Sequence, residues 1–341
     1  MLSLLPTPEQ EQIASATRDL LAASWPIERL RAAGANAGTA RWQELAALGA
    51  FGLGLPEQHG GLGLSAVEEL MVFREFGRFL LPPRVLASVL GARLAALTGE
   101  ADLATSIIAG HCRVGLLNAL TLPDIGPRIS GKFLLVDGDD CELLLVWDQH
   151  GAALLSRDTA APADARASLD NHVRIESCSL DQTAALAWLP ASHEPLFRRA
   201  DLLIAAMHVG IAEATRDMAI DYAKLRLAFG QAIGAFQAIK HRCADMAVRA
   251  EAAWCQCAVA AVGLRDDDAA VALDVSAARR IASEAALTNA EGNIQIHGGM
   301  GFSEEAHPHF FLKRALLLAQ LASLGHSNRA DLLAPVGGQA L

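Results

Sequence analysis

The sequence predicts an α+β protein in which a helical N-terminal domain, a small β domain and a helical C-terminal domain follow one another. Three observations lead to this fold class. Helix-type patterns fill the first and last parts of the chain, and short β-type runs are confined to the stretch between them. Aromatic residues make up 5% of the chain and tyrosine occurs once, which favours helix over sheet. A length of 341 residues, 52% of them hydrophobic, suffices for two or three domains with large cores.

The N-terminal domain is expected over residues 1–110, where helices alternate with short breaks. Thr7 followed by Pro8 is typical of a helix start, because the threonine side chain caps the first N–H groups and proline fits the first turn. The glycine-rich stretch 55–63 predicts a tight turn. A helix is expected over 65–79, ending before the proline pair that follows it.

The β domain is expected over residues 111–192. Its clearest strand signals are the runs 132–136, 141–146 and 173–175, which are rich in β-forming residues. Glycine and aspartate stand between these runs and favour turns. Short strands separated by such turns are typical of a small antiparallel sheet.

The C-terminal domain is expected over residues 193–341, with long helices at 198–225, 236–264 and 266–292. Three consecutive aspartates, 266–268, stand where the third of these helices is expected to begin. Because a helix N-terminus carries a partial positive charge, we interpret these aspartates as favourable helix-start residues and not as an ion site.

Charge and hydropathy exclude several classes of protein. A net charge of −10 argues against a general nucleic-acid surface. The longest apolar run, near residues 202–210, is too short to cross a bilayer. The N-terminus lacks the basic region of a signal peptide. We therefore expect a cytoplasmic protein that has no membrane segment.

The potential metal ligands also have unfavourable spacing. The six cysteines form no C-x-x-C pair, and Cys255 and Cys257 would point to different sides of a helix. His307 and His309 are two residues apart, whereas ligand pairs on helices stand three or four apart, and no third ligand follows them. The sequence therefore predicts no metal site, and buried thiols are the default interpretation of the cysteines.

Two polar, glycine-bearing segments interrupt the apolar C-terminal helices. The first begins Arg226-Leu-Ala-Phe229-Gly230 and continues through Phe236 and Gln237. An arginine at a helix end can offer its fork of donors to a pyrophosphate. A cation there also stabilises the helix C-terminus, so both roles stay open for Arg226 taken alone.

The second segment contains Gln295, followed by Gly298, Gly299, Met300 and Gly301. Adjacent glycines permit positive φ and leave backbone amides uncovered, so an anionic ligand can approach them closely. The glutamine adds a side-chain amide. An ordinary glycine helix stop would have the same sequence, so this alternative also stays open.

Taken in order, the two segments resemble the cofactor-facing segments of acyl-CoA dehydrogenases, flavoproteins that bury FAD between subunits. The matching pattern is R-x-x-F-G, then Phe-Gln, a basic pair and Ala-Asp-Met, and later Q-x-x-G-G-x-G-F. The likeness covers residues 1–110 and 193–335 and is weak between them. It implies an FAD-binding oligomer whose C-terminal domain is a four-helix bundle. The cofactor contacts that it implies are Arg226, Phe229, Phe236, Gln237, Gln295, Gly298 and Gly299.

The resemblance also implies a catalytic base that this chain lacks. In the family a glutamate removes the α-proton of the acyl thioester while the β-hydrogen leaves as hydride to the flavin. One family position for it, 24 residues past Gly298, holds Ala322 here. The other, ten residues before Gly210, holds Ala200. Its neighbour Asp201 is a weak candidate, since it is shorter and points in a different helical direction.

The middle of the chain departs from the family pattern as well. The family brings a Thr-Glu-x-x-x-Gly-Ser-Asp stretch and a Trp-Ile-Thr-Asn-like strand to the flavin ring. Residues 119–123 resemble the first only faintly, and nothing matches the second, so we expect a shortened β domain. Because it lacks both the base and the flavin-ring segments, the chain resembles the shorter, base-lacking subunit of bacterial α₂β₂ acyl-CoA dehydrogenases. These enzymes act on sterol side-chain CoA thioesters.

The resemblance thus implies a subunit that completes a shared FAD site, while a longer homologous partner supplies the glutamate and most acyl-CoA contacts. Two alternatives stay open. The chain could form a self-sufficient homotetramer with Asp201 or Glu305 as the base, or it could be a scaffold that binds neither flavin nor CoA. No residue selects a steroid over another bulky acyl group.

Overall fold

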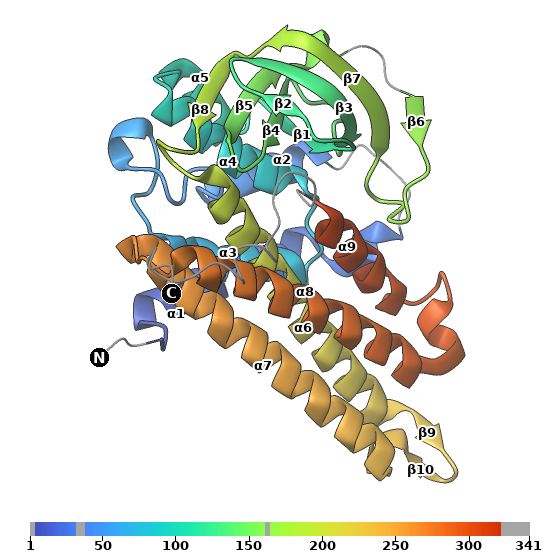
Figure 1. Ribbon diagram of the computed structural model, residues 1–341. Helices are drawn as coiled ribbons and strands as arrows, with labels where there is room; N and C mark the ends of the chain where they lie inside the picture. The colour runs from blue at the N-terminus through green and yellow to red at the C-terminus, as the bar shows by residue number, and fades with distance from the viewer. Residues whose placement is uncertain (1–3, 32–37, 161–163, 322–341) are drawn as a thin grey trace, which may run out of the picture.

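We describe a computed structural model covering residues 4–31, 38–160 and 164–321, excluding the side chains of residues 38–40. The chain passes from helices into a β-sheet and back into helices (Figure 1). The sheet lies at one end of the molecule, and the longest helices extend away from it. This α+β architecture confirms the predicted fold class.

Helices precede the sheet, and side-chain caps define where two of them begin. Thr7 and Gln10 form a reciprocal capping box at the start of the first helix, with Pro8 in the first turn, as predicted. Ser65 and Glu68 form a second capping box, and the helix they begin follows the predicted range closely. These helices are α1 (Pro8–Ser24), α2 (Gly38–Ala47), α3 (Ala66–Arg78), α4 (Arg84–Leu97) and α5 (Ala101–Ile108).

The described residues of the middle region form an eight-stranded sheet with the order β6-β7-β3-β1-β4-β5-β8, and β2 pairs with β3. Its strands are β1 (Val114–Ala119), β2 (Asp124–Ile125), β3 (Arg128–Val136), β4 (Leu143–Trp147), β5 (Gly151–Ser156), β6 (Asp164–Arg166), β7 (Ile175–Ala184) and β8 (Ala187–Pro190). The predicted antiparallel pairing is wrong for β1 and β4, which run parallel. The reason is that β3 turns back on one side of β1 and the chain then crosses to the other side.

Helix α4 covers one face of the sheet and lies against β1, β4, β5 and β8. All strands of this sheet lie between Val114 and Pro190. We therefore propose domain boundaries near residues 110 and 192, which divide the chain into parts 1–110, 111–192 and 193–341.

The C-terminal helices are α6 (Leu196–Leu225), α7 (Gln237–Asp266), α8 (Val271–His297) and α9 (Pro308–Gln320). A small hairpin of β9 (Leu227–Ala228) and β10 (Gln231–Ala232) follows α6, and a 3₁₀ turn, η6 (Gly298–Phe302), follows α8. The first three helices agree with the predicted ranges to within a few residues. Within the described residues, no helix is both long and apolar enough to span a bilayer.

The interpretation of the three aspartates is wrong for two of them. Asp266 is the last residue of α7 and pairs with Arg265, and Asp267 adopts the left-handed conformation that ends this helix. Asp268 does precede α8, and its carboxylate accepts the Ala270 N–H at 2.7 Å. Aspartate tolerates the left-handed region better than most residues, which allows the chain to turn here.

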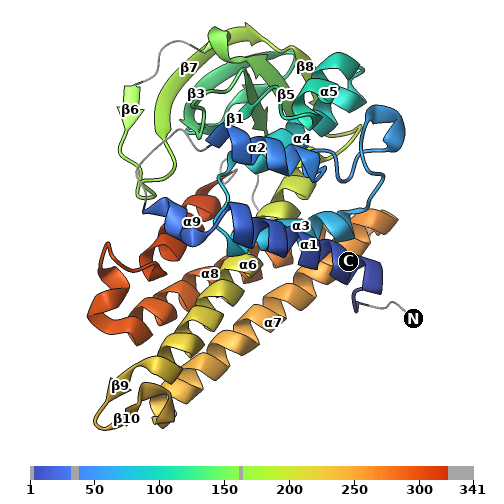
Figure 2. The same cartoon turned by 180° about the vertical axis from the view of Figure 1, so that it is seen from behind.

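Helices α3 and α6 cross in direct backbone contact. A Cβ on Gly77 would lie 1.9 Å from the Met207 carbonyl oxygen, and a Cβ on Gly210 would lie 1.9 Å from the Arg74 carbonyl oxygen. Only glycine fits at either position. Seen from behind, α1 and α3 lie across the long C-terminal helices (Figure 2).

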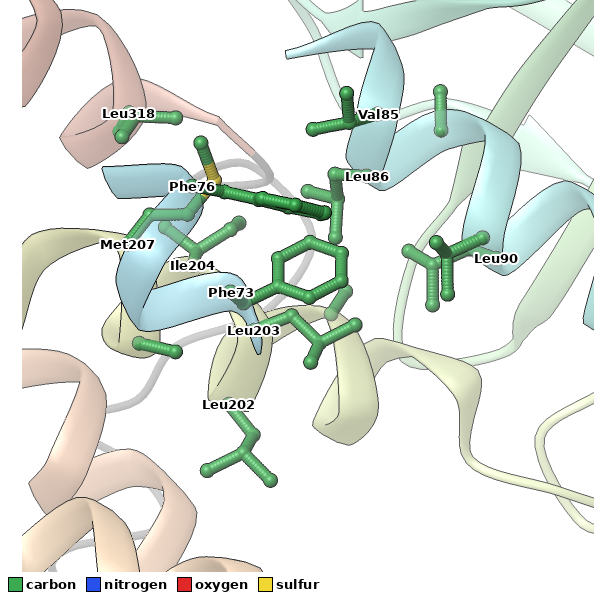
Figure 3. Close-up of a cluster of buried hydrophobic side chains, with 14 of the residues drawn as sticks. Phe73, Phe76, Val85, Leu86, Leu90, Leu202, Leu203, Ile204, Met207 and Leu318 are labelled. Atoms are coloured by element: carbon green, nitrogen blue, oxygen red, sulfur yellow. The ribbon is translucent and has the colours of Figure 1, made fainter. Parts of the chain in front are cut away.

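Apolar side chains fill the space around this crossing (Figure 3). They come from α3, α4, α6 and α9 and belong to one large core. Close packing of this kind fixes how the N-terminal helices sit on the C-terminal bundle. The labelled members are Phe73, Phe76, Val85, Leu86, Leu90, Leu202, Leu203, Ile204, Met207 and Leu318.

Candidate cofactor-binding site

The two glycine-bearing segments meet at the end of the helical bundle that lies away from the sheet (Figure 1). A small apolar cluster joins them. Ile296, the residue before the last of α8, packs with Ala219 and Ala223 of α6, and Ile233 and Ile239 from the first segment pack against the same cluster. The sequence placed these segments about 70 residues apart, and the fold brings them together.

Arg226 is the C-cap residue of α6 and has extended backbone angles. Its N–H donates to the Tyr222 carbonyl at 2.8 Å, and its own carbonyl accepts the Ile233 N–H at 2.8 Å. The side chain is exposed. Within the described residues no carboxylate and no carbonyl engages the guanidinium, so the side chain does not cap the helix and stays available to an anion.

Phe229 occupies the tip of the β9–β10 hairpin. Its side chain is 95% exposed, and its φ of 53° is unusual for a bulky residue. The ring meets Phe236 edge-to-face with the centroids 6.2 Å apart. Phe236 is the N-cap residue of α7, and Gln237, the first residue of that helix, exposes its side chain. The hairpin therefore presents aromatic surface and an amide to the outside.

Gly298 ends α8, so the glycine-stop interpretation is confirmed. Its angles, φ 61° and ψ −137°, lie in a region that essentially only glycine adopts. A Cβ on Gly298 or Gly299 would meet nothing within 4 Å. Gln295, one turn earlier, is also exposed. The same residues that stop the helix therefore leave an open surface beside the backbone of Gly299, while the Gly298 N–H donates to the Gln295 carbonyl.

Exposed apolar side chains surround the two segments. They lie on the last turn of α6, the hairpin and η6. Exposed patches of this kind mark surfaces that another molecule covers. Besides Phe229, they are Leu225, Leu227, Met300 and Phe302.

A shallow groove between α7 and α8 reaches Gln295. Its walls carry charges of both signs, with Arg242 and Arg249 as cations and Asp245 and Glu291 as anions. Arg249 is held in place by Asn289, whose side-chain oxygen accepts from Nε at 3.1 Å. The groove extends the polar surface from the glycine turn along the bundle.

Sequence reasoning missed an aromatic contact that links the segments. The Tyr222 ring in the last turn of α6 stacks on the His297 ring at the end of α8, with centroids 4.0 Å apart and planes at 24°. His297 Nδ1 donates to the Asn293 carbonyl at 2.9 Å. The sequence offered one signal for this contact, since Tyr222 is the only tyrosine in the chain.

The residues considered as positions for a catalytic base have surroundings that differ from one another. Ala200 is fully buried in the core near the start of α6. Glu305 lies exposed in the turn before α9, where its N–H donates to the Ser303 hydroxyl oxygen. Ala322 lies outside the described residues.

Asp201 is buried and belongs to an ionic network inside the bundle. Its carboxylate lies 3.4 Å from Arg279 Nε. Arg279 also donates to the carbonyls of Leu318 and Leu321 at the end of α9. His208 Nε2 donates to the Ala315 carbonyl at 3.1 Å, so its Nδ1 accepts from the guanidinium at 3.3 Å. Burial, and then the charge of Arg279, lower the pKa of His208 to about 3.

His307 and His309 flank the ring of Phe310 at the start of α9. Burial lowers the pKa of both imidazoles. Among the described residues no group of three or more His, Cys, Asp or Glu side chains is arranged to hold a metal ion. All six cysteines are free, and Cys255 is exposed whereas Cys257 is buried, as their spacing predicts.

Comparison with known proteins identifies the family. The model of the acyl-CoA dehydrogenase N-terminal domain matches residues 7–108, and that of the C-terminal domain matches residues 196–326. Acyl-CoA dehydrogenase IpdE2 of Mycobacterium tuberculosis is 32% identical over 276 residues, covering 80% of this chain and 79% of that protein. The chain belongs to the acyl-CoA dehydrogenase family, whose members are FAD-dependent oxidoreductases.

Solved structures share the fold. The Tcur3481-Tcur3483 steroid ACAD G363A variant matches with a TM-score of 0.82 and 24% identity, covering 95% of this chain and 96% of that one. The ChsE4-ChsE5 complex from Mycobacterium tuberculosis matches with a TM-score of 0.82 and 21% identity, covering 97% of each chain. Both similarities extend through the middle region, where the sequence resemblance is weak.

Proposed function

We propose that this chain is a subunit of a heteromeric FAD-dependent acyl-CoA dehydrogenase. It completes an FAD site shared with a longer homologous subunit, and that partner supplies the catalytic glutamate and most contacts to the acyl-CoA. The assembly that we propose is an α₂β₂ heterotetramer.

One observation gives the main support for a shared FAD site. The Arg226 guanidinium is exposed and unpaired within the described residues, and the open glycine turn at Gly298 and Gly299 lies at the same end of the bundle. An arginine fork and uncovered backbone amides are the donors that a pyrophosphate requires. Arg74, by contrast, is paired with Glu213, so its guanidinium is already engaged within the chain.

The surrounding residues fit the rest of an FAD molecule. Gln295 and Gln237 would donate to its polar edges, and Phe229 with Phe236 would offer aromatic faces to its rings. When bound, FAD supplies the acceptor for the hydride of the substrate. The exposed apolar side chains around the two segments indicate that a protein surface covers this end of the bundle.

The assignment of the base to a partner rests on Ala200 and Asp201. An alanine in a packed core cannot accept a proton, and Asp201 is engaged with the buried guanidinium of Arg279. A catalytic carboxylate needs access to the substrate. The solved structures of similar fold include a ChsE4-ChsE5 complex and a steroid ACAD, which supports a heteromeric enzyme for a steroid or other bulky acyl-CoA.

The test is co-expression with a longer acyl-CoA dehydrogenase homologue that carries the glutamate. We expect the purified complex to contain both chains in equal amounts and to retain FAD, and its dehydrogenation of an acyl-CoA to depend on the partner's glutamate. Replacing Arg226 by Ala should weaken FAD binding about 10- to 100-fold, because a charge-assisted contact is worth about 1.5–3 kcal/mol.

Arg280→Ala is the matched control. Arg280 is another exposed arginine of the bundle, near the far end of α8 from the glycine turn, and its loss should leave FAD affinity unchanged. Stoichiometric flavin and turnover from this chain alone would favour the homotetramer instead. A complex that forms without flavin and without any effect of Arg226→Ala would favour the scaffold.

A further inference from the structure

The stacked rings of Tyr222 and His297 are not among the proposed cofactor contacts, and only Tyr222 packs against a hydrophobic cluster. Each ring is only half-buried, so the pair lies at the margin of the small cluster formed around Ile296. The rings overlap almost face to face, with a 4.0 Å separation and a 24° angle. Such a contact limits how closely the two elements can approach, because the ring faces are already in van der Waals contact.

Each ring lies within four residues in the sequence of one of the proposed anion-binding groups. Tyr222 lies one helical turn before Arg226, and its carbonyl accepts the Arg226 N–H that ends α6. His297 immediately precedes Gly298, and its Nδ1 bond to the Asn293 carbonyl fixes the orientation of the imidazole on α8. Together with the small cluster around Ile296, the stack thus links the helix end that carries the guanidinium to the helix end that carries the glycine turn.

The contact is also uncharged at neutral pH. Burial lowers the pKa of His297, and the hydrogen bond to Asn293 only partly opposes this shift. A neutral imidazole adds no positive charge of its own to the site. Its contribution is therefore to geometry, whereas the attraction for phosphate comes from Arg226 and the backbone amides.

We propose that Tyr222 and His297 are a positioning pair, which sets the separation between the Arg226 guanidinium and the open turn at Gly298 and Gly299, so that the guanidinium and the Gly299 amide bind one pyrophosphate. This inference rests on the proposed function. Neither residue needs to touch the cofactor. Donors that must act together have to be held to within about 0.5 Å of their productive positions, which exposed helix ends do not achieve alone.

The experiment measures FAD dissociation constants of the two-chain complex by flavin fluorescence. His297→Ala should weaken FAD binding about 3- to 10-fold, because it removes an aromatic contact of ordinary strength. His297→Phe keeps a planar ring and should restore most of the affinity. Tyr222→Phe also retains the stack and should bind FAD as the unmodified complex does.

A double-mutant cycle separates positioning from general structural support. If His297 acts by placing Arg226, the variant carrying both Arg226→Ala and His297→Ala should bind FAD little worse than Arg226→Ala alone. The salt dependence of FAD binding should also decrease in His297→Ala, as it does in Arg226→Ala, because the guanidinium no longer meets the phosphates.

The two hypotheses fail in different ways. Fully additive losses, or failure of His297→Phe to restore affinity, would overturn the positioning role and leave the shared site intact. An Arg226→Ala complex that binds FAD normally would overturn the shared site, and the positioning role with it.

Discussion

The two parts of helix α6 differ sharply in burial and in what they contact. Every residue from Ala200 to Thr215 is buried, and α3 crosses this stretch with its backbone in contact. After residue 215 only Ala219 and Ala223 are buried, and the helix ends in the exposed residues Leu225 and Arg226. One continuous helix thus passes from the centre of the molecule to an unpaired surface.

This difference separates stability from ligand binding along a single element. Ala200, where the sequence resemblance implies one family position for a catalytic glutamate, belongs to the core. The distal end has few apolar contacts of its own and presents groups that suit an anion. Substitutions in the two parts should therefore have different consequences, in stability for the first and in association for the second.

The largest effect is expected at the α3–α6 crossing. Gly210→Ala would place a Cβ 1.9 Å from the Arg74 carbonyl oxygen, so the helices would have to separate. We expect a loss of about 4 kcal/mol or more in the free energy of unfolding, measured by urea denaturation or seen as insoluble protein. Gly299→Ala, where the added methyl meets nothing within 4 Å, should change stability by less than about 1 kcal/mol. Equal effects would contradict the comparison.

Asp201→Ala should have the next largest effect. It leaves the buried Arg279 guanidinium without its carboxylate, which destabilises a protein by about 3 kcal/mol or more. Turnover per folded complex should stay close to that of the unmodified enzyme if the partner supplies the base. A drop of about 100-fold or more in turnover with the fold intact would instead identify Asp201 as the base, since general acid–base groups contribute that much.

The buried part of α6 should also weaken in acid. The pKa of His208 is about 3 in the folded chain against a usual 6.5, so the unfolded chain takes up a proton first as the pH falls. The free energy of unfolding should then decrease by about 1.4 kcal/mol per pH unit between about pH 6 and pH 4. His208→Gln should remove this part of the slope in urea titrations, whereas replacing the exposed His193 by Gln should not.

The smallest effect on stability is expected at the distal end. Phe229→Ser should change the free energy of unfolding by less than about 0.5 kcal/mol, because the ring is 95% exposed. The same variant should weaken assembly with the partner about tenfold, the value of burying one phenyl ring. Isothermal titration against the partner would measure this, with Leu186→Ser in the turn between β7 and β8 as control. Unchanged assembly would argue that Phe229 lies outside the interface.

The helices could be predicted well because their signals are local. Thr7, Pro8 and the apolar periodicity of α6, α7 and α8 depend on neighbours within a few residues. The sheet was harder. Strands β1 (VGLLNA) and β5 (GAALLS) are largely buried, and apolar and polar residues do not alternate in them, so sequence alone does not distinguish them from helix.

The candidate site could likewise be predicted only in part from the sequence. The sequence identified the residues that project outward, because glycine and arginine at helix ends are recognisable in themselves. It could not find the Tyr222–His297 stack, which depends on two helices meeting, nor the pairing of Asp201 with Arg279. The helix-start interpretation of the aspartates at 266 and 267 was wrong because α7 extends further than its apolar pattern indicated.

The reciprocal contact of Gly77 and Gly210 has an evolutionary consequence. Each glycine faces a carbonyl of the other helix, so a side chain at either position would push against the backbone that the other glycine needs nearby. No single substitution can relieve this constraint, and a homologue that lost one glycine would have to re-space both helices. During evolution we therefore expect Gly77 and Gly210 to be retained longer than the side chains that pack around the crossing.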